Sequence, residues 1–108
     1  MTVNEYAKAV GARVLTMPHP EREITGGYSG DLLSWVMGRA KEGQLWVTIM
    51  TNINVLAVAS LLNLSCVILT ENAEVTPEFV ARAEEEEINL LLSEEDTFSL
   101  CAKSAQLI

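Results

Sequence analysis

The feature that most constrains the fold is a regular alternation of short apolar segments with segments of helical pattern. The apolar segments have strand length and carry β-branched or large aliphatic residues, which is typical of buried strands. The predicted strands are residues 12–16, 44–50, 66–70 and 88–92. The predicted helices are residues 4–10, 31–41, 55–62 and 77–87, followed by a C-terminal helix that starts at residues 93–96.

This alternation predicts the fold class. Strands that alternate with helices of about ten residues form βαβ units, in which neighbouring strands are parallel and the crossover is right-handed. We therefore predict an α/β fold with a mostly parallel sheet of about four strands and helices on both faces. The chain has 108 residues and is 49% hydrophobic, so a single folded domain over residues 1–108 is expected and a disordered chain is not.

Local signals predict where several helices begin. Asp31 is expected to cap the second helix, and Thr76 followed by Pro77 is expected to begin the fourth. Residues 93–96 resemble a capping box for the last helix, with Asp96 in the place of the usual Glu or Gln. The inner face of that helix is predicted to consist of Phe98, Cys101, Ala102 and Ala105.

The predicted helix at residues 55–62 is apolar almost all round. A helix without a polar face must be covered on both sides. In a small domain the second cover is expected to be another subunit, so we predict a homodimer. The predicted interface consists of Trp35, Val55, Val58, Ala59 and Leu62.

The charge is strongly negative and unevenly distributed. The formal net charge is -8, which argues against a nucleic-acid partner because phosphate binding depends on Lys and Arg. Residues 1–70 hold five acids and five bases, whereas residues 71–108 hold ten acids and two bases. The densest run, Glu84 to Glu87, is expected to be a solvated helix face. A docking patch for a basic partner or a divalent cation is the alternative.

The chemistry-bearing residues form no recognisable catalytic or metal-binding pattern. Cys66 and Cys101 lack clustered ligands, and the single histidine, His19, lies between two prolines in an expected exposed loop. We therefore predict no catalytic residues, no metal and no cofactor. The N-terminus shows no signal peptide and no apolar segment is long enough to span a membrane, so a cytoplasmic protein is expected.

Residues 24–30 are rich in glycine and lead into a predicted helix. Exposed backbone N–H groups at such a point can bind an anion, and open parallel sheets bind ligands beyond the carboxyl ends of their strands. The predicted site for a small anionic ligand consists of Thr25, Gly26, Gly27, Ser29, Thr51, Asn52, Thr70 and Asn72. The alternative is that the glycines serve a tight turn and the polar residues cap helices.

Four stretches of the chain resemble the DRTGG domain family. Residues 21–27, Glu-Arg-Glu-Ile-Thr-Gly-Gly, are similar to the family's Asp-Arg segment and the glycines after it, and residues 43–48, 66–71 and 91–98 are similar to its strand-entry, second-strand and closing segments. The resemblance covers residues 12–105. It implies a small α/β domain of the kind found inside larger bacterial proteins, related in fold to the N-terminal domain of HPr kinase/phosphorylase.

The resemblance extends to a stand-alone version of the domain, marked by residues 30–37, Gly-Asp-Leu-Leu-Ser-Trp-Val-Met. It implies dimerisation and a gene context of hydrogenase subunits and stress-type regulators. Glu87 is a departure, because relatives often have a helix-ending glycine there, and strain is expected before Ile88.

Three functions follow in decreasing order of support. The first is a non-catalytic regulatory or interaction domain that acts as a homodimer and contacts an unidentified protein partner. The second is a sensor of a small anionic or nucleotide ligand at the carboxyl ends of the strands. The least favoured is an enzyme accessory to phosphoryl transfer, because no Lys or Arg stands in a glycine loop to grip a phosphate.

Overall fold

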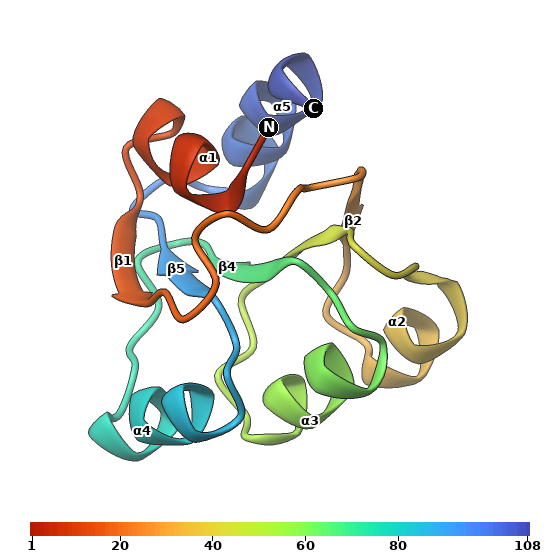
Figure 1. Ribbon diagram of the computed structural model, residues 1–108, viewed down its shortest axis with the longest axis vertical. Coiled ribbons are helices and arrows are strands. Elements are labelled where there is room, and N and C mark those ends of the chain that lie inside the picture. The colour runs from red at the N-terminus through yellow and green to blue at the C-terminus, as the bar shows by residue number, and fades with distance from the viewer.

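The computed structural model describes residues 1–108 and shows a three-layer α/β domain (Figure 1). The strands are β1 (Arg13–Thr16), β2 (Gly27–Ser29), β3 (Leu45–Thr48), β4 (Cys66–Leu69) and β5 (Leu90–Leu92). The helices are α1 (Val3–Ala9), α2 (Leu33–Arg39), α3 (Asn54–Leu61), α4 (Pro77–Glu85) and α5 (Thr97–Leu107). No helix is long and apolar enough to cross a membrane.

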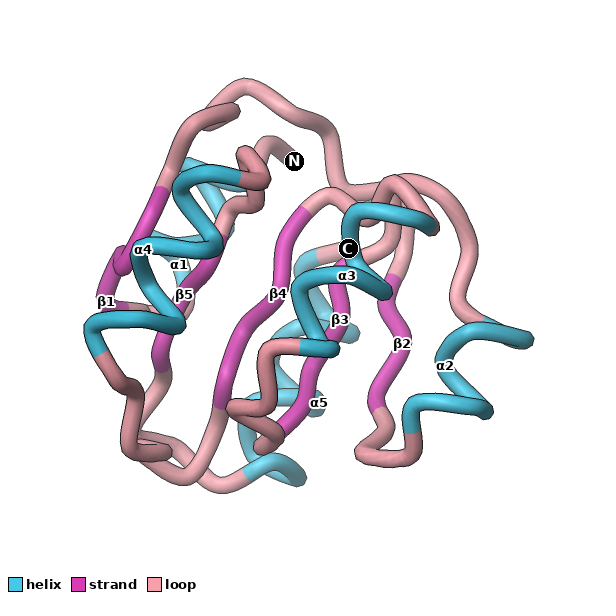
Figure 2. The backbone as a smooth tube through the Cα atoms, turned by 90° about the horizontal axis from the view of Figure 1, so that it is seen from below, coloured by secondary structure: helices cyan, strands magenta, loops and turns pink.

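The five strands form one sheet in the order β1-β5-β4-β3-β2. Strands β2 to β5 run parallel to their neighbours, and β1 pairs antiparallel with β5. Helices α2, α3 and α4 cover one face, and α1 and α5 cover the other (Figures 1 and 2). The predicted α/β class with a mostly parallel sheet is confirmed, although the sheet has five strands rather than about four.

The core lies on both faces of β3 and β4. All four residues of each strand are buried, and successive side chains alternate between the two faces. Trp46 packs with α2, α3 and α4, whereas Leu45 packs with α1 and α5. The sequence of a strand that is buried on both faces is a continuous apolar run. This is why the sequence predicts these two strands correctly.

Strand β2 was not predicted. The Gly-Tyr-Ser segment lacks any local strand signal, and it becomes a strand because it pairs with β3 in the register Gly27↔Leu45 and Ser29↔Val47. An edge strand tolerates glycine more readily than a central strand does, since it is paired on one side only. Part of the glycine-rich segment, Gly27–Ser29, is therefore sheet edge rather than a loop in front of a helix.

Two predicted helix starts are wrong. Helix α2 begins at Leu33 after Leu32, without a side-chain cap. The carboxylate of Asp31 instead accepts hydrogen bonds from the Thr48 hydroxyl at 2.8 Å and the Ile49 backbone N–H at 3.0 Å. Helix α5 begins at Thr97, with Asp96 as its N-cap, rather than at residues 93–96.

The predicted inner face of α5 is also wrong. The buried residues are Leu100 and Ser104, and Cys101 is partly buried, whereas Phe98 is 84% exposed. Ala102 and Ala105 are exposed as well. The sheet buries a stripe of the helix rotated by about one residue from the predicted one, because a helix with many small residues gives little local guide to its buried side.

The start of α4 is as predicted. The hydroxyl of Thr76 accepts a hydrogen bond from the Phe79 backbone N–H at 3.2 Å, and Pro77 occupies the first turn. The expected strain before Ile88 is also present, because Glu87 has a φ of 56°. That left-handed conformation is unfavourable for a residue with a Cβ atom.

Helix α3 is covered mainly by its own chain. Val55, Val58 and Ala59 are buried in the core beneath the sheet, together with Leu56. The apolar character of this helix therefore does not require a second subunit. Of the predicted interface residues, Leu62 is partly buried and Trp35 is 54% exposed, so Trp35 is the most accessible of the five.

Candidate functional site

The predicted ligand residues lie at opposite ends of the parallel strands. Thr25 lies beside the amino end of β3, where its backbone N–H donates to the Gly43 carbonyl at 3.0 Å and its hydroxyl donates to the Glu42 carbonyl at 3.2 Å. Gly26 and Gly27 are beside the same end, since Gly27 pairs with Leu45. Ser29 reaches further along β3, beside Val47.

The remaining predicted residues lie at the carboxyl ends of β3 and β4, but they do not share one cavity. Thr51 and Asn52 are exposed in the loop between β3 and α3. Thr70 is fully buried, with its hydroxyl 2.7 Å from that of Thr97. Asn72 lines a groove of about 730 Å³ between β1 and α4. The sequence could not show that the glycine segment begins at the amino end of the sheet, and this is why the eight residues are not brought together.

Gly26 and Gly27 line a different cavity, of about 240 Å³, on the other face of the sheet. Its walls also include Leu45, Val47 and Cys101, so it is mainly apolar. A ligand role for these glycines remains a prediction.

The loops at the carboxyl edge are held together by the protein's own polar groups. Asp31 joins the segment after β2 to the end of β3 through Thr48 and Ile49. The Glu71 carboxylate accepts a hydrogen bond from the Thr97 backbone N–H at 3.1 Å, which joins the end of β4 to α5. Of the predicted residues, Ser29, Thr51, Asn52 and Asn72 remain accessible at this edge.

An exposed apolar surface lies beside this edge. Leu32 and Trp35, at the start of α2, are 59% and 54% exposed, and Ile49 and Ile53, in the loop between β3 and α3, are 45% and 46% exposed. The two segments are adjacent because Ile49 bonds to Asp31, and α2 lies next to α3 (Figure 2). We call these four residues and Arg39 the α2 face.

Arg39 contributes to this surface through its contact with Trp35. Its guanidinium lies 4.0 Å from the centroid of the Trp35 ring. Such stacking orders both side chains and leaves a flat, partly apolar surface. Contiguous exposed apolar residues of this kind mark interaction sites in folded proteins.

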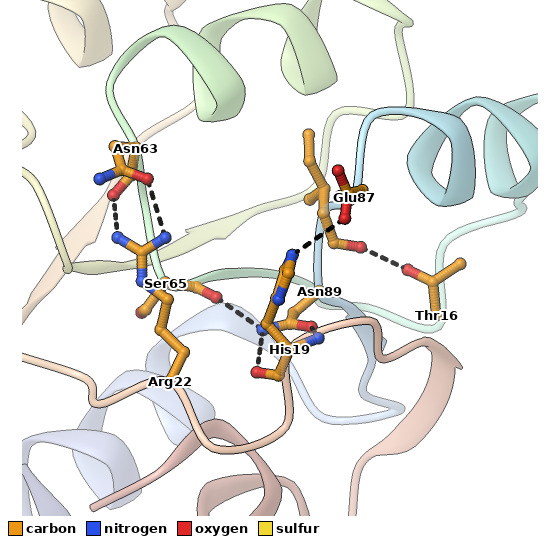
Figure 3. A network of polar contacts seen from close by, with 8 residues as sticks. Thr16, His19, Arg22, Asn63, Ser65, Glu87 and Asn89 are labelled. Atoms are coloured by element: carbon orange, nitrogen blue, oxygen red, sulfur yellow. Dashed lines mark hydrogen bonds and ion pairs between the residues drawn. The ribbon is translucent and has the colours of Figure 1, made fainter.

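A polar network at the amino ends of β4 and β5 was not predicted (Figure 3). The Asn89 side chain is buried and accepts a hydrogen bond from the His19 backbone N–H at 2.9 Å. Its amide also donates to the carbonyls of His19 at 2.8 Å and of Ser65 at 3.0 Å. The His19 ring lies 3.5 Å from the Glu87 carboxylate. These contacts hold the proline-flanked loop against the sheet.

Arg22 has a similar anchoring role. Its two terminal nitrogens donate to the side-chain oxygen of Asn63 at 2.8 Å and to the Asn63 carbonyl at 2.6 Å (Figure 3). Asn63 has a φ of 56°, so the guanidinium binds the carbonyl of a helix-ending residue in a left-handed turn. Arg22 belongs to the stretch that resembles the family's Asp-Arg segment, and here it positions a loop.

The two thiols differ in environment. Cys66 is buried and burial raises the pKa of its thiol to about 12, so the thiol keeps its proton at neutral pH. Cys101 is partly buried beside the apolar cavity. No group of three or more His, Cys, Asp or Glu side chains is arranged to hold a metal ion.

Comparisons with known proteins agree with this architecture. The family model of the DRTGG domain matches residues 5–107. No curated protein matches the chain. A similar solved structure is that of the CBS and DRTGG domains of the regulatory region of Clostridium perfringens pyrophosphatase, complexed with its activator, diadenosine tetraphosphate. The TM-score is 0.76 at 14% identity, over 97% of this chain and 46% of that one, so the likeness is one of fold and this chain spans about half of that region.

Proposed function

Because the chain belongs to the DRTGG domain family, we propose that it is a non-catalytic regulatory domain that works as a homodimer. The similar fold in the pyrophosphatase is part of a region described as regulatory, which supports a regulatory role. The polar side chains at both ends of the parallel strands support a non-catalytic role. Asn89, Arg22 and Asp31 all form hydrogen bonds that hold loops in place.

The observation that carries the homodimer is the α2 face. Leu32, Trp35, Ile49 and Ile53 each keep about half of their surface in solvent, which is a large apolar exposure for neighbouring residues of a small domain. Tryptophan and arginine are enriched among the residues that contribute most to binding at protein interfaces. A second copy that covered this surface would remove it from water.

Sedimentation velocity tests the homodimer. At micromolar concentration the protein is expected to sediment with about twice the 11.8 kDa mass of the chain. Trp35→Glu is expected to shift it to the monomer, because a carboxylate would then be buried at the contact. Phe98→Glu is the matched control, since Phe98 is 84% exposed on α5 and lies away from α2. A monomeric wild-type protein, or equal effects of both substitutions, would contradict the proposal.

A second candidate function is the sensing of a nucleotide. The pyrophosphatase region was solved with diadenosine tetraphosphate, and its fold is similar. In this chain the predicted ligand residues Ser29, Thr51 and Asn52 are accessible at the carboxyl edge, where open parallel sheets bind ligands. They lie in the same loops as the α2 face, so a ligand bound there would be close to the proposed dimer contact.

Thermal denaturation with ATP, diadenosine tetraphosphate, phosphate or acetyl phosphate tests the sensor. A ligand at 100 times its dissociation constant stabilises the fold by about 2.7 kcal/mol. Asn52→Ala is expected to remove such a shift, whereas Asn4→Ala in α1 is expected to leave it. If all four compounds leave the melting temperature unchanged at millimolar concentration, the sensor is contradicted and the regulatory homodimer is unaffected.

A further inference from the structure

We infer that two copies of the chain meet through α2, with the two α2 helices antiparallel and Trp35 next to the two-fold axis. This inference rests on the proposed homodimer and assigns its contact surface and orientation. Three observations carry it: the side-chain pattern of α2, the distribution of charge over the molecule, and the order of charges along α2.

Helix α2 has one side in the core and one side without a cover. Val36 and Ala40 are buried against the sheet. Leu32, Trp35 and Arg39 follow one another at spacings of three and four residues, so they form a stripe along the helix. Trp35 is next to the middle of α2, which spans Leu33–Arg39. A stripe centred on its largest residue can meet its own copy across a two-fold axis.

The distribution of charge favours a contact at this edge of the sheet over a contact at the opposite edge. Residues 71–108 carry ten acids and two bases, and they include α4 and the loops that follow β4 and β5. In the sheet, β2 and the adjacent α2 lie at one edge, and β1 and β5 lie at the other (Figure 1). Two copies joined at α2 keep their acidic parts apart, whereas contact through α4 would bring them together.

The charges along α2 select the antiparallel orientation. Asp31 precedes the helix, Arg39 ends it and Lys41 follows it. In an antiparallel pair, Asp31 of one copy lies near Arg39 and Lys41 of the other, so opposite charges meet at both ends. In a parallel pair, each of these charged groups would lie near the same group of the other copy and repel it.

Cysteine cross-linking distinguishes the two orientations. The parent is Cys101→Ser, because the remaining Cys66 is buried. Leu32→Cys and Arg39→Cys are made separately in this parent, and their sedimentation is measured before treatment with a short bismaleimide. In the antiparallel pair position 32 faces position 39, so an equimolar mixture of refolded subunits is expected to cross-link strongly, and each variant alone weakly.

A second pair keeps the stripe intact. Ser34 and Met37 are exposed but lie on the side of α2 away from the stripe, because each is one or two residues from Trp35 rather than three or four. A mixture of Ser34→Cys and Met37→Cys is therefore expected to cross-link weakly. Ala102→Cys on α5 is exposed and serves as a control that is expected not to cross-link. Ser34→Cys and Met37→Cys are both expected to sediment as the parent does, so they show how far Leu32→Cys or Arg39→Cys weakens the dimer.

The outcomes separate this inference from the proposed function. Strong cross-linking of each variant with itself would overturn the antiparallel arrangement. Variants that sediment as dimers but yield no cross-link between positions 32 and 39 would overturn the α2 contact and leave the homodimer standing. A parent that is monomeric at all concentrations would overturn the proposed homodimer itself.

Discussion

At the scale of single residues, Glu87 occupies a backbone conformation that suits glycine. Its φ is 56°, and it follows the last turn of α4, where its N–H bonds to the Glu84 carbonyl at 3.1 Å. In this left-handed conformation the clash of the Cβ atom costs roughly 1–2 kcal/mol, and glycine removes that clash. The exposed contact of Glu87 with His19 offsets little of this, because such pairs contribute about 0–1 kcal/mol.

Glu87→Gly is therefore expected to stabilise the fold by about 0.5–1 kcal/mol in urea denaturation with an unchanged slope. Glu86→Gly is the matched control. Glu86 has a φ of -87°, so glycine relieves no strain there and a small loss of stability is expected. A loss of stability in Glu87→Gly would show that the His19 contact outweighs the backbone strain.

Cys66 makes the stability of the fold depend on pH in the alkaline range. Burial raises the pKa of its thiol from 9.0 to about 12. Between these values the unfolded chain loses the proton while the folded chain keeps it, so stability is complete below pH 9 and falls as pH rises. The slope attributable to this thiol is at most about 1.4 kcal/mol per pH unit.

Urea denaturation at pH 8 to 10 measures this slope. Cys66→Ala is expected to be less stable than wild type at pH 8 because it loses core volume, but its stability should fall less steeply with pH. Parallel curves for the two proteins would contradict the stated origin of the pH dependence.

At the scale of elements, the junction between β2 and β3 shows that its glycines are not equivalent. Gly43 has a φ of 82°, and a Cβ atom built there would lie 2.6 Å from the Thr25 hydroxyl oxygen. Gly27 lies in β2, and the nearest neighbour of an added Cβ would be the Leu45 carbonyl oxygen at 3.8 Å. Gly43 is needed for the turn into β3, whereas Gly27 is not needed for its strand.

Gly43→Ala is expected to destabilise the fold by roughly 2 kcal/mol, from the left-handed backbone and the contact with Thr25. Gly27→Ala is expected to stabilise the fold by no more than about 1 kcal/mol, because alanine reduces the conformational entropy of the unfolded chain. Thermal denaturation of the two variants measures the difference, and equal losses would contradict this account of the junction.

The acidic end of α4 is a solvated face in this structure. Glu85 is exposed, and Glu86 forms a partly exposed pair with Arg82 at 3.7 Å. Changing both Glu85 and Glu86 to Gln is expected to shift the free energy of unfolding by about 0.5 kcal/mol or less. A loss above about 2 kcal/mol in urea denaturation would mean that these carboxylates hold a partner or an ion.

How far the sequence predicts each element depends on whether its signal is local. Strands β3 and β4 are predicted because burial on both faces leaves an uninterrupted apolar run, and α4 because Thr76 and Pro77 act within one turn. Strand β2 and the role of Asp31 are missed, since both depend on pairing with β3, which is distant in sequence. No residue spacing indicates these contacts.

The same limit explains the candidate site. The sequence locates Thr70 and Asn52 correctly at the carboxyl ends of strands, but it cannot show that the Thr70 hydroxyl is taken by Thr97 or that Thr25 lies at the amino end. The anchoring of His19 by Asn89 joins residues 70 positions apart and has no local signal. Trp35 is recognisable as a core or interface residue, and only the fold shows that it is exposed.

At the scale of the whole molecule, the two edges of the sheet differ in character. The β1 edge has an irregular register between Val14 and Thr16 and carries Arg13, which discourages further strand pairing. The acidic residues lie in and around α4, β4 and β5, toward that side. The β2 edge belongs to the neutral part of the chain and adjoins the α2 face, so a second copy meets least repulsion there.

The central claim is that a second copy covers the α2 face, and acrylamide quenching of tryptophan fluorescence tests it without changing the interface. Trp46 is fully buried and Trp35 is 54% exposed, so quenching in the monomer comes from Trp35. The account predicts that quenching is weak at high protein concentration and rises on dilution as the dimer dissociates. Trp35→Phe should abolish this dependence. Equal access of acrylamide to Trp35 at every concentration would contradict the claim that a second copy covers the α2 face.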